Sequence, residues 1–248
     1  MDIARYLERI GFTSAIRHDV DVLEALQRAH LTAVPFENLH VYHRRGVSTA
    51  TEWSVPKVVE QRRGGWCFEL NGAFAALLEA LGFRVQRFAA TVMIGGVTGS
   101  EPTHLTIEVT LDRPYLVDVG FGDSFIRPLP LDDPGPHDGG VGDFVFAADD
   151  GMTTMYERTT LGDQPKYRFA PTPVDLASFD AASRRFQTQP GLHWTAAPFA
   201  TRLLDGGPDR VTLLADRIKF RRGGVWCEEP VAPDQWEAAL LRWFGMTP

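Results

Sequence analysis

The sequence predicts an α+β fold, in which helices and strands are grouped along the chain instead of alternating. Three observations predict it. The first eighty-odd residues carry apolar side chains at helical spacing. The stretch from about residue 84 to residue 169 is rich in Val, Thr, Phe and Ile between turn-forming clusters, and the last third mixes both patterns. Helices followed by strands, without a repeated strand–helix–strand order, are typical of α+β proteins.

Four helices are expected in the N-terminal third. Their ranges are about 3–10, about 19–31, from about 54 onwards, and from the Gly64-Gly65 break to about residue 81. Asp2 and Gly11 are suitable start and stop residues for the first helix, and Gly82 stops the fourth. Pro56 is expected in the first turn of the third helix, where proline is tolerated. The PFENL segment at 35–39 is expected to form a loop.

Strands are expected through the middle of the chain and again near its end. Residues 103–109 and 115–119 are predicted strands, and residues 132–142 form a turn-dense loop. After an irregular stretch, strands are expected between about 210 and 226, followed by a helix at 234–244.

Composition and charge exclude several classes of protein. Lys and Arg number 25 against 32 Asp and Glu, which gives a net charge of −7 and argues against nucleic acid or an anionic membrane as partner. No apolar run approaches the ~18 residues that a membrane-spanning helix needs, and the N-terminus lacks the apolar core of a signal peptide. Two cysteines cannot form a disulfide framework, so we expect a cytoplasmic protein with free thiols.

Cys67 is the strongest candidate for a reactive side chain. It follows Gly64-Gly65-Trp66 at the expected start of the fourth helix, where unpaired N–H groups and the helix dipole favour a thiolate. The same N–H groups could receive the oxyanion that forms when the thiolate attacks a carbonyl. Free cysteines are often buried and inert, so Cys67 needs a partner base to be catalytic.

His104 and Asp118 are the expected partners. Strand alternation puts both on one face of a predicted hairpin, away from Leu105. A three-residue loop centred on Arg113 would pair residue 108 with Asp118, which leaves Asp118 four positions, or about 13 Å, from His104. Contact therefore requires a bulge or another register. Assembled, Cys67 would be the nucleophile, His104 the base, and Asp118 the group that orients the imidazole.

Four motifs resemble the arylamine N-acetyltransferase family, densely up to about residue 125. They are PFENL (35–39), RGGWCFELN (63–71), the HL of THLTIEV (103–109) and VDVGFG (117–122). The resemblance implies a helical bundle at 1–83, an antiparallel β-barrel at 84–172 and an α/β lid at 173–248, around a cysteine-protease-like catalytic core. The chain is short for the family, which is expected to affect lid contacts and the choice of acceptor.

The resemblance also implies a reaction. Acetyl-CoA acetylates Cys67, and an arylamine, arylhydrazine or N-hydroxyarylamine then takes the acetyl group; no metal is implied. The aromatic substrate pocket would consist of Phe36, Val92, Phe121 and Phe199. The loop at 95–103 would lie beside the cofactor pyrophosphate, with Gly96, Thr98, Gly99, Ser100 and Thr103 as cofactor-binding residues.

Neighbouring residues receive plainer interpretations. Glu69 and Asn71 are interpreted as structural, and Arg63 is expected to pair with a carboxylate. Cys227, beside two glutamates, is interpreted as a non-catalytic thiol. His40 and His43 are interpreted as solvated loop residues instead of metal ligands.

Other functions use the same residues. An amide synthase of this family would close a macrolactam from a carrier-bound aminoaryl polyketide on the same cysteine. A thiol hydrolase or transglutaminase-like enzyme would also fit the order Cys, His, Asp, and a non-enzymatic binding protein could retain the fold.

Overall fold

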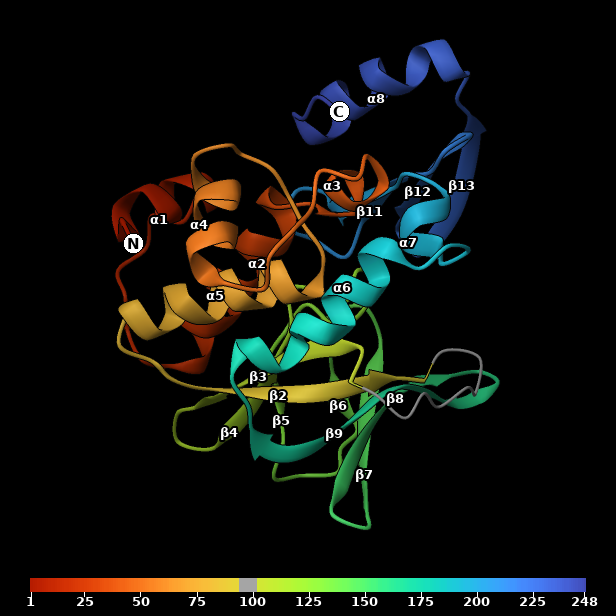
Figure 1. Cartoon of the computed structure of the whole chain (residues 1–248). Helices are drawn as coiled ribbons and strands as arrows, with labels where there is room; N and C mark the ends of the chain where they lie inside the picture. Colours follow the sequence, from red (N-terminus) through yellow and green to blue (C-terminus); the bar gives the residue numbers. More distant parts are fainter. Residues whose placement is uncertain (94–101) are drawn as a thin grey trace.

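The computed structural model describes residues 1–93 and 102–248. Figure 1 shows the N-terminal helices above a strongly curved sheet, with a second sheet and the C-terminal helix to one side. The chain therefore has the expected α+β architecture of a helical part, a barrel and an α/β lid, and this fold-class prediction is confirmed.

The helical part contains five helices among the described residues. They are α1 (Ile3–Ile10), α2 (Val20–Ala33), α3 (Leu39–Tyr42), α4 (Thr51–Val59) and α5 (Cys67–Ala80). The Asp2 side chain accepts a hydrogen bond from Arg5 N at the start of α1, and Gly11 ends the helix with a φ of 69°. The expected stop and start residues of α1 are therefore used as predicted.

Two expectations for this part were wrong in detail. Pro56 lies in the interior of α4 and not in its first turn, because the helix begins three residues earlier than Ser54. PFENL is not a simple loop. Phe36–Glu37 forms β1, which pairs with a strand from the far end of the chain, and Leu39 begins α3.

Helix α5 is buried on all sides, which explains its lack of a polar face. Its residues from Cys67 to Ala75, together with Leu77 and Leu78, are buried. Phe74 and Leu78 pack with α1 and α2, and Ile107 and Val109 of the barrel belong to the same core. A helix enclosed between two layers is held rigidly, so its first residue has a fixed position.

The barrel is an eight-stranded antiparallel sheet in the order β5-β4-β3-β2-β9-β8-β7-β6. The strands are β2 (Arg84–Val92), β3 (His104–Thr110), β4 (Pro114–Val117), β5 (Leu129–Pro130), β6 (His137–Asp138), β7 (Asp143–Asp149), β8 (Met152–Thr159) and β9 (Gly162–Pro173). The edge strands β5 and β6 lie near one another, so the sheet nearly closes. Both are short strands in or beside the turn-dense segment.

A second, five-stranded sheet has the order β1-β10-β11-β12-β13. Its later strands are β10 (Ala200–Leu203), β11 (Arg210–Leu213), β12 (Arg217–Arg222) and β13 (Val225–Pro230). The remaining helices are the 3-10 helix Leu176–Phe179, α6 (Asp180–Thr188), α7 (His193–Ala196), the 3-10 helix Pro233–Gln235 and α8 (Trp236–Phe244). Trp236, Leu240 and Phe244 of α8 cover one face of this sheet. No helix among the described residues is long and apolar enough to cross a membrane.

Candidate active site

Cys67 is the first residue of α5 and is 4% exposed. The residue before it, Trp66, has extended backbone, and its N–H donates to Glu69 Oε2 at 3.3 Å. Within residues 1–93 and 102–248, no hydrogen bond from the Cys67 N–H is found. The thiol therefore lies at a helix N-terminus with a backbone donor beside it.

The helix start is fixed by a buried charge network. Glu69 Oε1 accepts hydrogen bonds from Lys57 Nζ at 2.8 Å and from Trp53 Nε1 at 2.9 Å. Burial raises the pKa of the Glu69 carboxyl, and Lys57 opposes that rise. Every oxygen of Glu69 is thus occupied by structural contacts, in line with its structural interpretation.

His104 and Asp118 meet because the hairpin has a different register from the one expected. Strand β3 pairs Glu108 with Leu116 and Thr110 with Pro114, so the loop is centred on Asp112 instead of Arg113. The shift moves the pairing by two residues, which keeps the face of each side chain and shortens the offset to two positions, roughly 7 Å. Because β4 ends at Val117, Asp118 lies just beyond the strand, and its Oδ2 comes within 2.6 Å of His104 Nε2.

The Asp118 carboxylate is held by a complete set of donors. Oδ1 accepts from Asn71 Nδ2 and from Gly120 N, each at 2.8 Å. Oδ2 accepts from His104 and, at 3.2 Å, from the Tyr167 hydroxyl. These donors fix the position of the carboxylate, which in turn fixes the imidazole that it binds.

The surroundings of His104 favour the protonated form of its imidazole. It is 2% exposed, and burial by itself would lower its pKa, but the Asp118 carboxylate and the Cys67 side chain outweigh burial and raise it. Because Nε2 faces Asp118, the other ring nitrogen is left for the thiol. The Cys67 Sγ also lies 3.9 Å from the Thr103 carbonyl oxygen.

These groups open onto a cavity of about 410 Å³. The four residues expected in the substrate pocket, Phe36, Val92, Phe121 and Phe199, all line it. Sequence reasoning missed further lining residues from α6, α7 and the segment between them, which are Phe186, Leu192, His193 and Trp194. The Trp194 ring lies 6.0 Å from Phe36 and 5.9 Å from Phe199, so it completes an aromatic wall.

The sequence did not identify Trp194 as a lining residue, because its segment matches no motif and has no periodic pattern. The only available hint was the proximity of an unassigned tryptophan to the Pro198-Phe199 pair. Helix α6, which carries Phe186, was likewise not expected, because Phe186 is the only large apolar side chain on its buried face, beside Ala182 and Ser183.

Glycines allow the loop after Asp118 to approach Cys67. A Cβ on Gly120 would lie 2.7 Å from the Cys67 Cα, and one on Gly122 would lie 3.3 Å from the Phe36 ring. Gly122 also has a φ of 90°, which other residues rarely adopt. The VDVGFG motif thus brings Asp118 and Gly120 against α5 at close range.

The cofactor-binding residues expected in the 95–103 loop are only partly described. Gly96, Thr98, Gly99 and Ser100 lie outside the described residues. Thr103 lines the cavity, and its hydroxyl accepts a hydrogen bond from Val92 N at 3.0 Å.

Other residues singled out in the sequence lie away from the cavity. Arg63 was expected to pair with a carboxylate, and this was wrong for the described part of the chain. Its Nη1 donates to the Thr247 carbonyl at 2.7 Å instead. Cys227 is exposed on β13 and unpaired. In the described ranges, no group of three or more His, Cys, Asp or Glu could hold a metal ion.

Comparison with known proteins gives consistent matches along the chain. A family model described as N-acetyltransferase matches residues 19–247. The arylamine N-acetyltransferase of Mycolicibacterium smegmatis is 33% identical over 236 residues, covering 91% of this chain and 84% of that protein. Human arylamine N-acetyltransferase 1 is 37% identical over 142 residues, covering 53% of this chain and 47% of that protein.

Solved structures extend the match to the whole fold. The arylamine N-acetyltransferase of Mycobacterium marinum has a TM-score of 0.90 and 28% identity, covering 98% of this chain and 92% of that chain. A structure of the M. marinum protein in complex with CoA has a TM-score of 0.89 at 28% identity, with the same coverage. The Salmonella typhimurium protein has a TM-score of 0.92 and 25% identity, covering 98% of this chain and 90% of that chain.

Proposed function

The chain belongs to the arylamine N-acetyltransferase family, and on that premise we propose that it works through a thioester on Cys67. The enzyme is an acyltransferase that uses acetyl-CoA. The acceptor would be an arylamine, arylhydrazine or N-hydroxyarylamine. The observation that carries the proposal is the buried set of Cys67, His104 and Asp118 at the base of an aromatic cavity.

In the first half-reaction, the Cys67 thiolate attacks the acetyl carbonyl carbon. The oxyanion that forms is stabilised by the Cys67 N–H at the start of α5. When the carbonyl re-forms, the bond between carbon and the CoA sulfur breaks, and the departing sulfur takes the proton that His104 carries. Cys67 is left as an acetyl thioester, and His104 is left neutral.

In the second half-reaction, the acceptor nitrogen attacks the thioester carbon. Neutral His104 takes a proton from that nitrogen, the carbon–sulfur bond breaks, and the amide product leaves. The thiolate and the imidazolium are then restored. Asp118 supports the imidazolium in both half-reactions, because its Oδ2 lies 2.6 Å from Nε2.

The cavity supports a small aromatic acceptor over a carrier-bound polyketide. Its volume of about 410 Å³ is near the lower end of the usual range for ligand pockets. Its walls are mainly aromatic, and Phe36, Phe199 and Trp194 lie within 6.0 Å of one another, centroid to centroid. A flat ring can pack against such a wall, whereas an amide synthase of this family would need more room.

We also place the enzyme in the cytoplasm, because both cysteines are unpaired.

Intact mass and peptide mapping test the mechanism. Incubation with acetyl-CoA alone should add one acetyl group to Cys67, and an aniline should then remove it. Cys67→Ser should leave no exchangeable thioester, while Cys227→Ala should be acetylated normally. Acetyl transfer that survives Cys67→Ser would refute the proposal. An unacetylated Cys67 that still reacts with iodoacetamide would point to another acyl donor.

A further inference from the structure

One part of the active-site cavity wall has few contacts with the rest of the protein. Residues 189–198, which we call the α7 wall, connect α6 to β10 and include α7. None of these residues is buried, whereas Phe186 before them and Ala200 after them are. Both ends of the α7 wall are therefore anchored, while its middle, which places Trp194 in the cavity, depends on a small number of contacts.

Asn38 supplies the hydrogen bonds that hold this middle part. Its Nδ2 donates to the Trp194 carbonyl at 2.9 Å and to the Ala197 carbonyl at 2.8 Å, and its Oδ1 accepts from Phe199 N at 2.9 Å. Within residues 1–93 and 102–248, no other residue beyond α6 forms a hydrogen bond or ion pair with the α7 wall. Asn38 is 1% exposed and lies between β1 and α3. A single buried amide therefore positions the α7 wall.

The remaining contacts of the α7 wall are mainly aromatic. The ring of Trp194, which is partly exposed, lies 5.5 Å from Trp66, 6.0 Å from Phe36 and 5.9 Å from Phe199, centroid to centroid. An aromatic ligand that enters between these rings forms contacts of the same kind. Such a ligand has no substitute for the hydrogen bonds of Asn38, so these bonds decide where the α7 wall stays.

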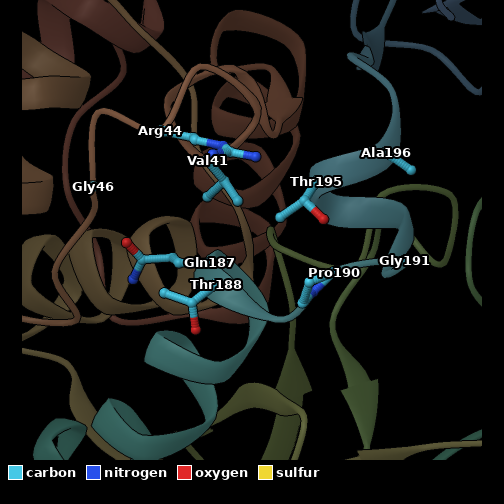
Figure 2. Close-up of a pocket in the computed structure, with 9 residues that line it drawn as sticks. All are labelled: Val41, Arg44, Gly46, Gln187, Thr188, Pro190, Gly191, Thr195 and Ala196. Atoms are coloured by element: carbon cyan, nitrogen blue, oxygen red, sulfur yellow. The ribbon is translucent and has the colours of Figure 1, made fainter.

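A second cavity, of about 620 Å³, lies behind the α7 wall. Figure 2 shows it between α3 with the chain that follows and the α6–α7 segment, and Thr195 of α7 points into it. Pro190, Gly191 and Ala196 also line it from the α7 wall, and Val41 lines it from α3. The α7 wall thus has a cavity on each face, whereas a segment packed against a core has no space into which it could move.

We propose that Asn38 determines the size of the acceptor that the enzyme takes. Its hydrogen bonds hold the α7 wall against the active-site cavity and so favour a single aromatic ring. When these bonds are lost, the α7 wall moves into the second cavity, and the space beside Cys67 admits a larger ring system. Asn38 lines neither cavity, so it is a positioning residue that acts through Trp194. The inference rests on the proposed function, because it assumes an aromatic acceptor.

Selectivity between a small and a large acceptor tests the inference. Asn38→Leu removes all hydrogen bonds of the side chain and keeps its approximate size. The ratio of kcat/KM for 4-phenylaniline to kcat/KM for aniline should rise by about tenfold, since the α7 wall no longer has to be pulled from its donors. Asn38→Ala should shift the ratio in the same direction.

Gln187→Leu is the matched control. It also removes an amide, which accepts from Val47 N at 2.9 Å and donates to Val47 O at 3.0 Å, but which forms no hydrogen bond with the α7 wall. The selectivity ratio of this variant should stay within about twofold of wild type.

Ala196→Trp tests the role of the second cavity, because Ala196 is exposed and a tryptophan there would fill the space behind the α7 wall. In the Asn38→Leu background it should return the ratio to within about threefold of wild type. On its own it should lower the ratio several-fold, which keeps the test decisive if the Asn38 variants do not fold.

Amide hydrogen exchange measures the release of the α7 wall without turnover. In Asn38→Leu, a peptide that covers residues 189–199 should exchange about tenfold faster, while peptides from α5 should exchange as in the wild type. Alkylation of Cys67 by iodoacetamide should also be unchanged, because Glu69 and not Asn38 holds the start of α5. A merely structural role of Asn38 would accelerate exchange in α5 as well.

Several results would overturn the inference. They are a selectivity ratio within twofold of wild type in both Asn38 variants, an equal shift in Gln187→Leu, no reversal by Ala196→Trp, and equal acceleration of exchange in α5. If acetyl-CoA does not acetylate Cys67, the proposed function fails, and hydrogen exchange still decides whether Asn38 holds the α7 wall. If Cys67 is acetylated and aniline removes the acetyl group, but the ratio does not respond to Asn38, only the inference fails.

Discussion

At the scale of single residues, the Asp118 carboxylate shows how a buried charge is kept in place. It receives hydrogen bonds from Asn71 on α5, from Gly120 N, from His104 on β3 and from Tyr167 on β9. Burial and the Asp118 charge raise the pKa of Tyr167 well above its usual value, so its hydroxyl stays protonated and can donate. Tyr167 Oη also lies 3.1 Å from Thr106 Oγ1, which anchors the ring.

Tyr167→Phe should therefore reduce activity without unfolding the protein. One of the donors to a charged, buried oxygen is removed, and we expect kcat/KM to fall by about tenfold or more. Steady-state kinetics and the melting temperature measure the two effects separately. A variant with wild-type kinetics would show that the remaining donors suffice to hold Asp118.

The state of His104 predicts an unusual pH dependence for Cys67. Because Asp118 and Cys67 raise the pKa of His104 against the effect of burial, the His104 imidazolium should persist through neutral pH beside the Cys67 sulfur. Alkylation of Cys67 by iodoacetamide should then change little between about pH 6 and pH 8, whereas an ordinary thiol speeds up about tenfold per unit below its pKa near 8.5.

Cys227 serves as the comparison within the same molecule, because it is exposed and unpaired. Mapping both peptides at each pH gives the two profiles in one experiment. His104→Gln should convert the profile of Cys67 into that of an ordinary thiol. Parallel profiles for Cys67 and Cys227 in the wild type would rule out the ion pair.

At the scale of elements, the sequence predicted the shared face of His104 and Asp118 and the wrong loop centre. Alternation along β3 depends only on strand geometry, so the shared face of His104 and Asp118 could be predicted. The register depends on which residues form the turn, and here Pro114 begins β4, where its missing N–H costs no hydrogen bond within the strand. A shift of two residues is invisible to alternation, and it halved the distance that the side chains had to cover.

The pairing of strands that lie far apart in the chain was the other feature that could not be predicted from the sequence. Phe36 and Thr201 are adjacent in one sheet although 165 residues separate them, and no local pattern in PFENL indicates this pairing.

Asp123 connects the segment that follows Asp118 to the second sheet. Its Oδ1 lies 3.2 Å from Arg210 Nε and 3.0 Å from Arg221 Nη1. Arg210 is 2% exposed, and burial lowers its pKa to about 10 while Asp123 opposes this.

Asp123→Asn should loosen the acceptor pocket more than the catalytic groups. Phe121 is two residues away, and Arg210 would lose its charged partner, at a cost of about 2–3 kcal/mol in the free energy of unfolding, since Asp123 is partly exposed. We expect a several-fold rise in the KM for an aniline and an unchanged rate of Cys67 alkylation. Asp216→Asn, which removes an exposed pair with Arg217, is the matched control. An unchanged KM for the aniline would show that Asp123 does not influence the shape of the pocket.

At the scale of the whole molecule, the joint core of helices and barrel contains an uncharged histidine. His30 of α2 lies 3.1 Å from the Tyr6 hydroxyl and 5.0 Å, ring to ring, from Phe74. Burial, and secondarily Arg9, lowers the pKa of His30 to about 3. The unfolded chain takes up a proton on this histidine below about pH 6.5, and the folded chain does not.

Stability should consequently fall as the pH decreases from about 6.5 towards 3. The unfolded state binds more protons in this range, so His30 contributes a slope of up to about 1.4 kcal/mol per pH unit to the free energy of unfolding. Urea unfolding at pH 7, 6 and 5 measures this slope. His30→Gln should reduce the number of protons taken up on unfolding by about one. Identical slopes in the two proteins would show that His30 is already protonated in the folded state.

Cys67 precedes His104 and Asp118 in the sequence, which sets the order in which the three residues are synthesised. The growing helical segment therefore carries the thiol before the chain contains its two partners. The part of the cavity wall formed by Phe36 is completed later still, because β1, which contains Phe36, pairs with β10 at residues 200–203. On the proposed mechanism, a chain that ends before residue 104 should therefore form no thioester with acetyl-CoA.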